Sequence, residues 1–251
     1  MFYNEKQRWV ACVHEAAHAV IASLGGAGVH EIAVASLGSG KWDGDYDEYD
    51  RSVSHLVRAG YCRMSGVGLE ICFSRWDSNE NLYRVDRRAF STFMRYSHPR
   101  KLRDELRRQL RAQVCSLLAG PISEEILWYP DDPGSVPLDP ADIQSPNDDF
   151  NKAMRTAELL SGRKEGWRLM DLTEAKLREE AVWDSVLTLA RLLSEKGKLS
   201  YEEIPLPNPI GLNWPPSVTA NRISASFALS SIVRVLMVIL PCWVNLTAFP
   251  R

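Results

Sequence analysis

The chain of 251 residues is 45% hydrophobic and 25% charged, which is ordinary for a globular protein and sufficient to bury a sizeable core. Its formal net charge of −2 gives no global reason to expect nucleic acid as a partner. The cysteines show no CxxC spacing and no signal peptide precedes the first helix, so we expect a reducing, cytoplasmic location without a thiolate zinc site.

The first predicted element is a helix from about residue 5 to residue 24. Asn4 is a suitable N-cap, and Gly25 with Gly26 closes the segment. Apolar residues recur at helical spacing between these ends, at Val10, Val13, Ala17, Val20, Ile21 and Leu24. The helix is therefore predicted by its start signal, its stop signal and its periodicity together.

This helix carries the pattern H-E-x-x-H at His14, Glu15 and His18. Residues four apart lie on the same face of a helix, so both imidazoles can bind one metal ion. Glu15 follows the first histidine directly, where a carboxylate can take a proton from zinc-activated water. The pattern predicts a catalytic zinc site, and the alternative is a helix whose histidines only pack or form hydrogen bonds.

Short strands and loops are expected after the first helix. Residues 29–35 include several β-branched side chains in loose alternation and predict a strand. Residues 38–50 are rich in Gly, Asp and Tyr and predict a polar loop. We expect short strands around residues 52–57 and 67–73, and a helix over about residues 79–96.

A long helix is predicted from about residue 100 to residue 127. Apolar residues recur on one face, at Leu102, Leu106, Leu110, Val114, Leu117 and Leu118. Pro121 is expected to kink or restart this helix, because proline lacks the backbone N–H that a helix needs. Residues 128–146 contain several prolines and aspartates and predict a linker without regular structure.

The linker ends in a helix start. Ser145 is a suitable N-cap and Pro146 suits the first helical position, which places Asp148 and Asp149 in the first turn. A simple role for both acids is to complement the helix dipole. Glycines at 162 and 166 are expected to end this segment.

A further helix is predicted from Asp171 to about Lys196. Helical patterns thus dominate the chain, and the expected fold class is mostly α with a small β-hairpin or sheet.

The last part of the chain differs in composition. Residues 205–216 are rich in proline, and residues 227–249 are strongly apolar. The apolar stretch is long enough to cross a membrane, but Arg234 and Pro241 interrupt it. Membrane contact through residues 227–249 and a tail that docks on the protein remain alternatives.

The predicted zinc site needs a third ligand. Catalytic zinc is usually bound by three protein ligands, with a fourth position open to water. No further histidine stands at a spacing related to the motif, so a carboxylate is the better candidate. The candidates are Glu124, Glu125, Asp148 and Asp149.

Three segments resemble, in the same order, motifs of the FtsH-type ATP-dependent zinc metalloproteases. Residues 14–20 (HEAAHAV) resemble the family's H-E-A-G-H-A, and residues 118–127 (LAGPISEEIL) its L-A-G-R-A-A-E-E-L. Residues 147–153 (NDDFNKA) resemble the S-N-D-L-x-x-A-T segment that carries the family's third zinc ligand. With the following helix and residues 199–204, the resemblance covers about residues 5–204.

The resemblance implies a role for individual residues. Aligned on Phe150 and Ala153, it makes Asp149 the third ligand beside the two histidines, with Asp148 as the alternative if the register shifts by one. Glu124 or Glu125 would orient a ligand histidine.

The chain also departs from the family. Ala17 stands where the family has glycine, Pro121 stands where it has arginine, and the insert over residues 128–146 is unusual there. No G-x-x-x-x-G-K-[ST] phosphate loop occurs in the 251 residues. ATP-driven unfolding and hexamer formation are therefore not implied for this chain.

The sequence thus predicts an FtsH-like zinc metallopeptidase domain over residues 1–204, followed by a Pro-rich linker and apolar tail over residues 205–251. His14, His18 and Asp149 are the expected Zn²⁺ ligands and Glu15 the expected catalytic base. The expected partners are a polypeptide substrate and a separate ATPase or FtsH-like subunit. The alternatives are a non-catalytic FtsH-like regulatory subunit and a zinc hydrolase that cleaves another kind of bond.

Overall fold

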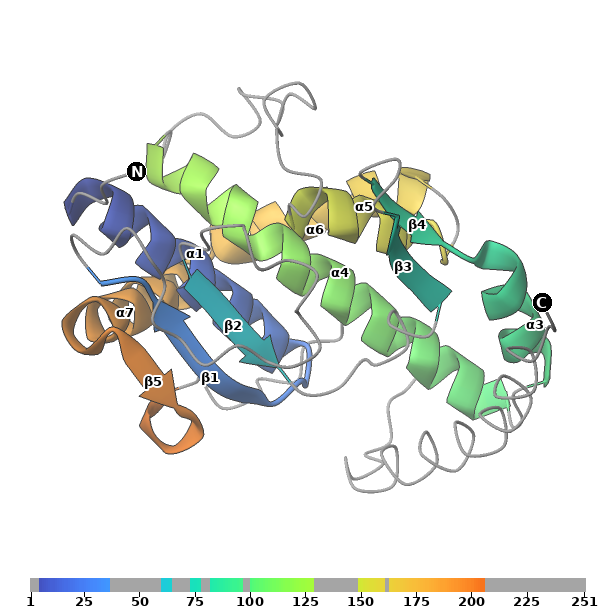
Figure 1. Ribbon diagram of the computed structural model, residues 1–251, viewed down its shortest axis with the longest axis horizontal. Coiled ribbons are helices and arrows are strands. Elements are labelled where there is room, and N and C mark those ends of the chain that lie inside the picture. Colours follow the sequence, from blue (N-terminus) through green and yellow to red (C-terminus); the bar gives the residue numbers. More distant parts are fainter. Residues whose placement is uncertain are drawn as a thin grey trace, which may run out of the picture. The chain divides into compact units, whose positions relative to one another are not determined.

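In the computed structural model, the central element is α4 (Arg100–Trp128), a helix of 29 residues (Figure 1). It packs against α1 (Glu5–Leu24), α5 (Asp149–Ala157) and α6 (Arg163–Leu177). Helix α7 (Glu180–Lys196) packs against α1. The fold is mostly α, as predicted, and α4 is the element that joins most of its parts.

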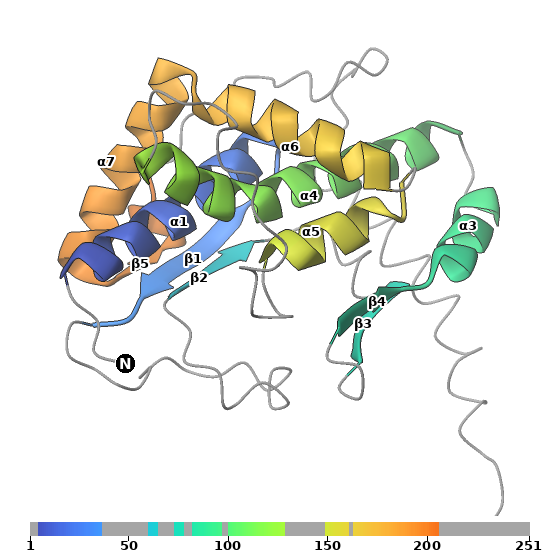
Figure 2. The ribbon, with the colours of Figure 1, turned by 90° about the horizontal axis from the view of Figure 1, so that it is seen from above.

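A small antiparallel sheet lies against α1. Strand β1 (Val29–Val34) is its centre, between β2 (Gly60–Met64) and β5 (Lys198–Ser200). Figure 2 shows α1, α4, α6 and α7 on one side of this sheet. After β5 the chain forms the 3₁₀ turn η2 (Tyr201–Glu203). The strand predicted after the first helix is confirmed as β1.

A second pair of strands lies at the far end of α4 from α7 (Figures 1 and 2). Strands β3 (Ser74–Asp77) and β4 (Leu82–Val85) pair as an antiparallel hairpin. Helix α3 (Arg87–Tyr96) follows directly and buries Phe90 and Met94. The aromatic ring of Phe90 packs edge-on against Phe73, with ring centroids 5.3 Å apart.

The structure describes residues 5–36, 60–64, 73–77, 82–96, 100–128, 149–160 and 163–205. The chain divides into two compact units, Met1–Trp214 and Pro215–Arg251, and all described residues belong to the first. Several predictions fall outside them: the Asn4 cap, the loop at 38–50, the strand at 52–57, most of the strand at 67–73, the linker at 129–146, the start of the next helix at 145–148 and the tail at 206–251.

Helix α1 is buried on nearly all sides because α4, α7 and the sheet surround it. Eight of its apolar residues are at most 1% exposed: Cys12, Val13, Ala16, Ala17, Ala19, Val20, Ile21 and Ala22. A helix that is apolar all round is stable only inside a protein. Gly26, with φ of +85°, ends it in a conformation that glycine adopts readily. The buried helix provides a rigid base for the two histidines.

The strand β4 corrects one prediction. Residues 82–85 were expected to be helical, but they pair with β3 instead, with Tyr83 opposite Trp76 and Leu82 opposite Asp77. The helical part of the prediction is confirmed over α3. Cross-strand pairing decides the structure here, and this long-range partner is not visible in the local periodicity.

Helix α4 continues as one element through Pro121, so the helix does not restart there, which was one of the two predicted outcomes. Leu118 and Ile122, on either side of the proline, are almost fully buried in the core. Burial of the flanking turns offsets the hydrogen bond that proline cannot donate.

Gly166 lies inside α6, so the predicted helix end there is wrong, and so is the predicted start at Asp171. A Cβ at Gly166 would lie 2.8 Å from Met154 Sδ and 3.3 Å from Ala157 Cβ. The glycine thus allows α6 to approach α5 closely, which is a packing role. The chain breaks instead between Leu177 and Glu180, where α6 ends and α7 begins.

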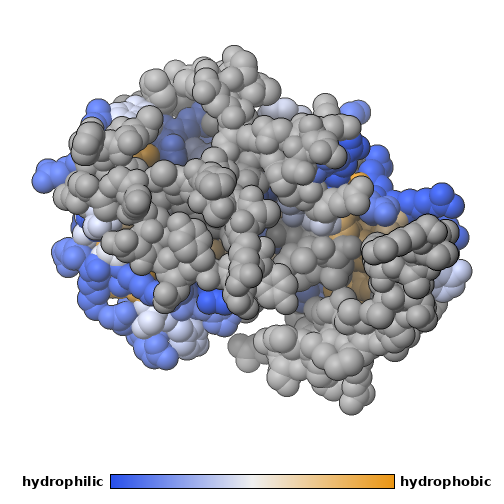
Figure 3. All heavy atoms as spheres, in the orientation of Figure 1, coloured by the Kyte–Doolittle hydropathy of each residue, from blue (hydrophilic) through white to orange (hydrophobic). Residues whose placement is uncertain are grey.

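The described surface is mostly hydrophilic on the face shown in Figure 3, and apolar residues are visible there only in small areas. Among the described residues, no helix has the length and apolar character needed to cross a membrane.

A buried ion pair connects α4 to α6. Glu165 is only 9% exposed, and it accepts hydrogen bonds from Arg111 Nε at 2.7 Å and from Arg168 Nε at 3.0 Å. The bond from Arg168 lowers the pKa of the Glu165 carboxyl to about 2; burial opposes this shift and Arg111 adds to it. The folded state therefore stabilises the charged carboxylate.

Replacement of Glu165 by Gln is expected to lower the free energy of unfolding at neutral pH by about 1.5–3 kcal/mol, because the buried carboxylate loses its charge-assisted hydrogen bonds with Arg111, which is partly buried, and with Arg168, which is exposed. The folded-state pKa lies below the ordinary 4.5, so this contribution is present above pH 4.5 and is lost as the pH falls toward about 2. Urea unfolding followed by circular dichroism measures it. Glu180→Gln, at an exposed residue, is the control and should change stability by less than about 0.5 kcal/mol; equal stability of both variants would contradict the assignment.

Candidate metal centre

The two histidines of α1 face α4 with their rings close together. The ring centroids of His14 and His18 are 4.6 Å apart, and the ring planes meet at 77°. His18 is almost fully buried, whereas the His14 side chain is 19% exposed. The pair therefore lies at the edge of the core, with one ring reachable from outside.

Asp149, the first residue of α5, joins the two histidines. Its Oδ2 atom lies 3.4 Å from His14 Nε2 and 3.2 Å from His18 Nε2. One ligand atom from each of the three residues lies within 4.8 Å of the others, so the group could hold a metal ion. The structure brings together the three residues that were predicted as ligands.

Helix α4 holds the other nitrogen of each ring. His14 Nδ1 lies 2.5 Å from Glu124 Oε1, and His18 Nδ1 lies 2.6 Å from the carbonyl oxygen of Ser116. Carboxylate and carbonyl oxygens only accept hydrogen bonds, so each Nδ1 carries the proton. In a neutral ring, each Nε2 then presents its lone pair to Asp149. Glu124 fills the position that was predicted for either Glu124 or Glu125.

The spacing on the two helices matches. The α4 contacts come from Ser116 and Glu124, eight residues apart, with Gly120 halfway between them. Residues at intervals of four lie on one face of a helix, and this face lies opposite His14 and His18. The earlier histidine contacts the later α4 residue, so the two helices run antiparallel at this point.

Gly120 leaves room at the centre of the group. A Cβ at this position would lie 2.4 Å from His14 Nε2 and 2.5 Å from His18 Nε2. The helix backbone thus comes closer to the imidazoles than any other residue type would allow. The space that a Cβ would fill is next to the Nε2 atoms of both histidines.

The charges in the group depend on one another. Burial alone would lower the pKa of His14, but hydrogen bonds to Asp149 and Glu124 raise it well above its ordinary value. Burial alone would raise the pKa of Asp149, but its contacts with His14 and His18 lower it strongly. A positive charge between these groups is therefore favoured, and a proton or a metal ion can supply it.

Glu15 is buried against the sheet. It is 7% exposed, and a Cβ added to Gly60 of β2 would lie 2.8 Å from its Cγ and 2.9 Å from its Oε1. The negative charge of Glu15 contributes to the raised pKa of His14, so the carboxylate lies near the group. Gly60 lets β2 pass directly beside the predicted catalytic base.

Sequence reasoning missed Ser116, Gly120, Gly60 and Cys62. Burial, together with the charges of Glu15 and Asp149, raises the pKa of the Cys62 thiol well above its ordinary value, so it stays protonated beside the site. The four-residue interval between Ser116, Gly120 and Glu124 was visible in the sequence and could have indicated a face directed at the histidines. Asp148, the alternative third ligand, lies outside the described residues.

A comparison with protein-family models finds no match, and a comparison with curated proteins finds none either. The relationship to FtsH-type proteases therefore rests on the sequence motifs and stays a prediction.

Replacement of Gly120 by Ala is expected to lower the affinity for an added divalent metal ion, tested with Zn²⁺, by about 10–100-fold, because the new methyl group displaces the imidazoles or fills the space between them. Competition with a chromophoric chelator measures the affinity, and circular dichroism checks the fold. Gly166→Ala is the matched control, since that helical glycine faces the flexible end of Met154. A Gly120→Ala variant that binds zinc as tightly as this control would contradict the assignment.

Proposed function

We propose that this chain is a zinc-dependent metallopeptidase that hydrolyses peptide bonds in unfolded or flexible protein segments, and that it is related to the FtsH-type proteases. The observation that carries the proposal is that His14 and His18 of α1 lie close to Asp149 of α5, although the two helices are far apart in the sequence. Glu15 stands next to the first of them in the sequence and is buried nearby.

The donor set suits zinc. Two imidazole nitrogens and one carboxylate oxygen are typical zinc ligands, and three protein ligands are the usual number in a catalytic site. In a tetrahedral zinc site, neighbouring donor atoms lie roughly 3.3 Å apart. The two nitrogen–oxygen distances here are 3.2 and 3.4 Å. Zinc bound by these residues would polarise the scissile carbonyl and lower the pKa of a water toward about 7.

Glu15 is the proposed catalytic base. Its carboxylate accepts a proton from the attacking water as the oxygen–carbon bond forms, and it passes that proton to the amine as the carbon–nitrogen bond breaks. A buried carboxylate suits this exchange, since the surrounding water that would compete for the proton is largely excluded. The role follows from the position of Glu15 beside His14.

Glu124 and Ser116 are the proposed positioning residues. Each accepts a hydrogen bond from the Nδ1 of one histidine and so fixes the ring orientation and the tautomer. The carboxylate of Glu124 also makes His14 a more basic ligand.

The proposed substrates are segments that are already unfolded. No phosphate loop occurs in the 251 residues, so the chain itself supplies no ATP-driven unfolding. A folded substrate would require a separate ATPase. The second candidate function is that of a non-catalytic partner subunit. Such a subunit would bind the metal ion but would not cleave peptide bonds.

Replacement of Glu15 by Gln should leave zinc bound and lower the rate of casein cleavage by at least about 100-fold, because the amide cannot accept the proton. Metal analysis and a fluorescent casein assay, with and without chelator, measure the two properties. A Glu15→Gln variant that binds as much zinc as the wild type and cleaves casein at the same rate would refute the role of Glu15. Zinc-loaded wild-type protein that cleaves no casein would favour the non-catalytic subunit.

Asp149→Ala and Asp148→Ala form a matched pair that tests the third ligand. Removal of the Asp149 carboxylate should abolish stoichiometric zinc binding, because it takes away the oxygen that lies nearest both Nε2 atoms. Asp148→Ala should keep the metal. Metal content after dialysis decides between them, and loss of zinc in Asp148→Ala alone would move the ligand to the neighbouring residue.

A further inference from the structure

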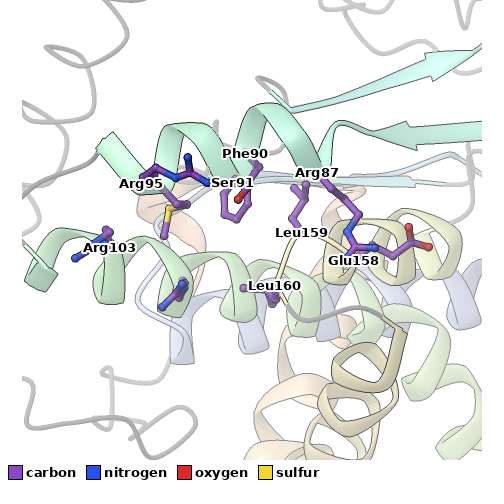
Figure 4. Close-up of a pocket in the computed structure, with 10 residues that line it drawn as sticks. Arg87, Phe90, Ser91, Arg95, Arg103, Glu158, Leu159 and Leu160 are labelled. Atoms are coloured by element: carbon purple, nitrogen blue, oxygen red, sulfur yellow. The ribbon is translucent and has the colours of Figure 1, made fainter.

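A cavity of about 370 Å³ lies between α3, α4 and the residues that follow α5. Four arginines line it, Arg87 and Arg95 on α3 and Arg103 and Arg107 on α4. In Figure 4, Phe90, Leu159 and Leu160 lie in the middle, with Arg95 and Arg103 on one side and Arg87 and Glu158 on the other. The cavity combines an apolar floor with a strongly basic rim.

The basic rim has few counter-charges. Arg107 has a long ion pair with Asp104, at 3.9 Å, whereas no carboxylate among the described residues lies within ion-pair distance of Arg87, Arg95 or Arg103. The one acidic residue that lines the cavity, Glu158, pairs with Arg155 outside it at 3.0 Å. The rim therefore carries a net positive charge that the described part of the protein does not neutralise.

Arg103 adds a second sign of a missing anion. Its Nε atom is buried and makes no hydrogen bond with the described residues. A buried N–H group of a guanidinium without an acceptor is costly, and an anion in the cavity would supply that acceptor.

The first turn of α4 strengthens the same field. This turn contains no acidic residue, and two arginines with described side chains belong to it, Arg100 and Arg103. The N-terminus of a helix is itself positive, so basic side chains there repel it. A bound anion would relieve this repulsion as well as the charge of the arginines.

The floor indicates the rest of the ligand. Phe90, Met94 and Leu159 are each 5% exposed and form a packed apolar surface. The volume falls in the range of sites for small organic molecules. Arginine binds phosphate through two parallel hydrogen bonds, and a phosphomonoester brings close to two negative charges.

We infer that this cavity binds a small organic phosphate, with the phosphate group among the arginines and the apolar part over Phe90 and Met94. The site is separate from the metal centre. Asp149 of the candidate metal centre is the first residue of α5, whereas Glu158 and Leu159 of the cavity follow its last residue. The two sites are therefore separated by the length of this nine-residue helix, roughly 14 Å.

Isothermal titration calorimetry on the full chain tests the inference with three probes. Phenyl phosphate carries both the anion and the apolar ring, inorganic phosphate carries only the anion, and benzyl alcohol carries only the ring. We expect phenyl phosphate to bind at least about tenfold more tightly than either of the others. The same titration on His14→Ala tests whether the phosphate binds at the metal centre instead. This variant should bind phenyl phosphate as the wild type does, and loss of binding in it would overturn the inference.

Two variants and a control locate the site. The double variant Arg95→Gln and Arg107→Gln should weaken phenyl phosphate binding by at least about tenfold, since two charge-assisted hydrogen bonds are lost. Ser91→Glu, which adds a carboxylate to the lining, should abolish it by repulsion. Arg88→Gln changes an exposed α3 arginine outside the lining and should have no effect. No binding of phenyl phosphate, or equal binding by all variants, would overturn the inference.

Discussion

The close approach of α4 to α1 is the constraint on which the rest of the site depends. Gly120 allows the α4 backbone to lie against the imidazoles of His14 and His18, and the same face of α4 supplies the acceptors for their Nδ1 atoms. Two antiparallel helices with matching four-residue intervals thus fix both rings from one side. The Nε2 atoms of both rings face Asp149 Oδ2.

Packing makes this approach possible. The α1 residues around the histidines are small or apolar and fully buried, and the hydroxyl of Ser116 bonds the backbone carbonyl of His18 at 3.1 Å, so the two helices are also joined directly. Asp149 is held in a similar way: the next residue, Phe150, is buried and packs against Trp167 of α6 with centroids 6.2 Å apart. All three predicted ligands therefore stand on regular helices with packed neighbours. Such sites are positioned more accurately than sites on loops.

The sequence predicted those parts of the structure that depend on local signals. The helix α1 and the shared face of His14 and His18 follow from capping residues and periodicity. The partnership with Asp149 did not follow from spacing, because it joins residues 131 and more positions apart, and it required the resemblance to a known family. The strand β4 was mispredicted because its partner strand is not visible in the local periodicity. The helix does not restart at Pro121, because burial of the flanking turns in the core decides its continuity. Gly120 shows the limit most clearly, since its role exists only once α1 lies against α4.

The electrostatics of the cluster link the site to the stability of the fold. Two lone pairs and a carboxylate converge on one point inside the protein, and without a cation such an arrangement would repel itself. The raised pKa of His14 and the lowered pKa of Asp149 indicate that a positive charge at this point is favoured. A metal ion bound here would gain affinity from an arrangement that the core already forms, since the packing of α1, α4 and α5 offsets the entropy lost on assembly. The helices α1, α4 and α5 form both the core and the site. A substitution that loosens the packing of the core is therefore expected to weaken metal binding as well.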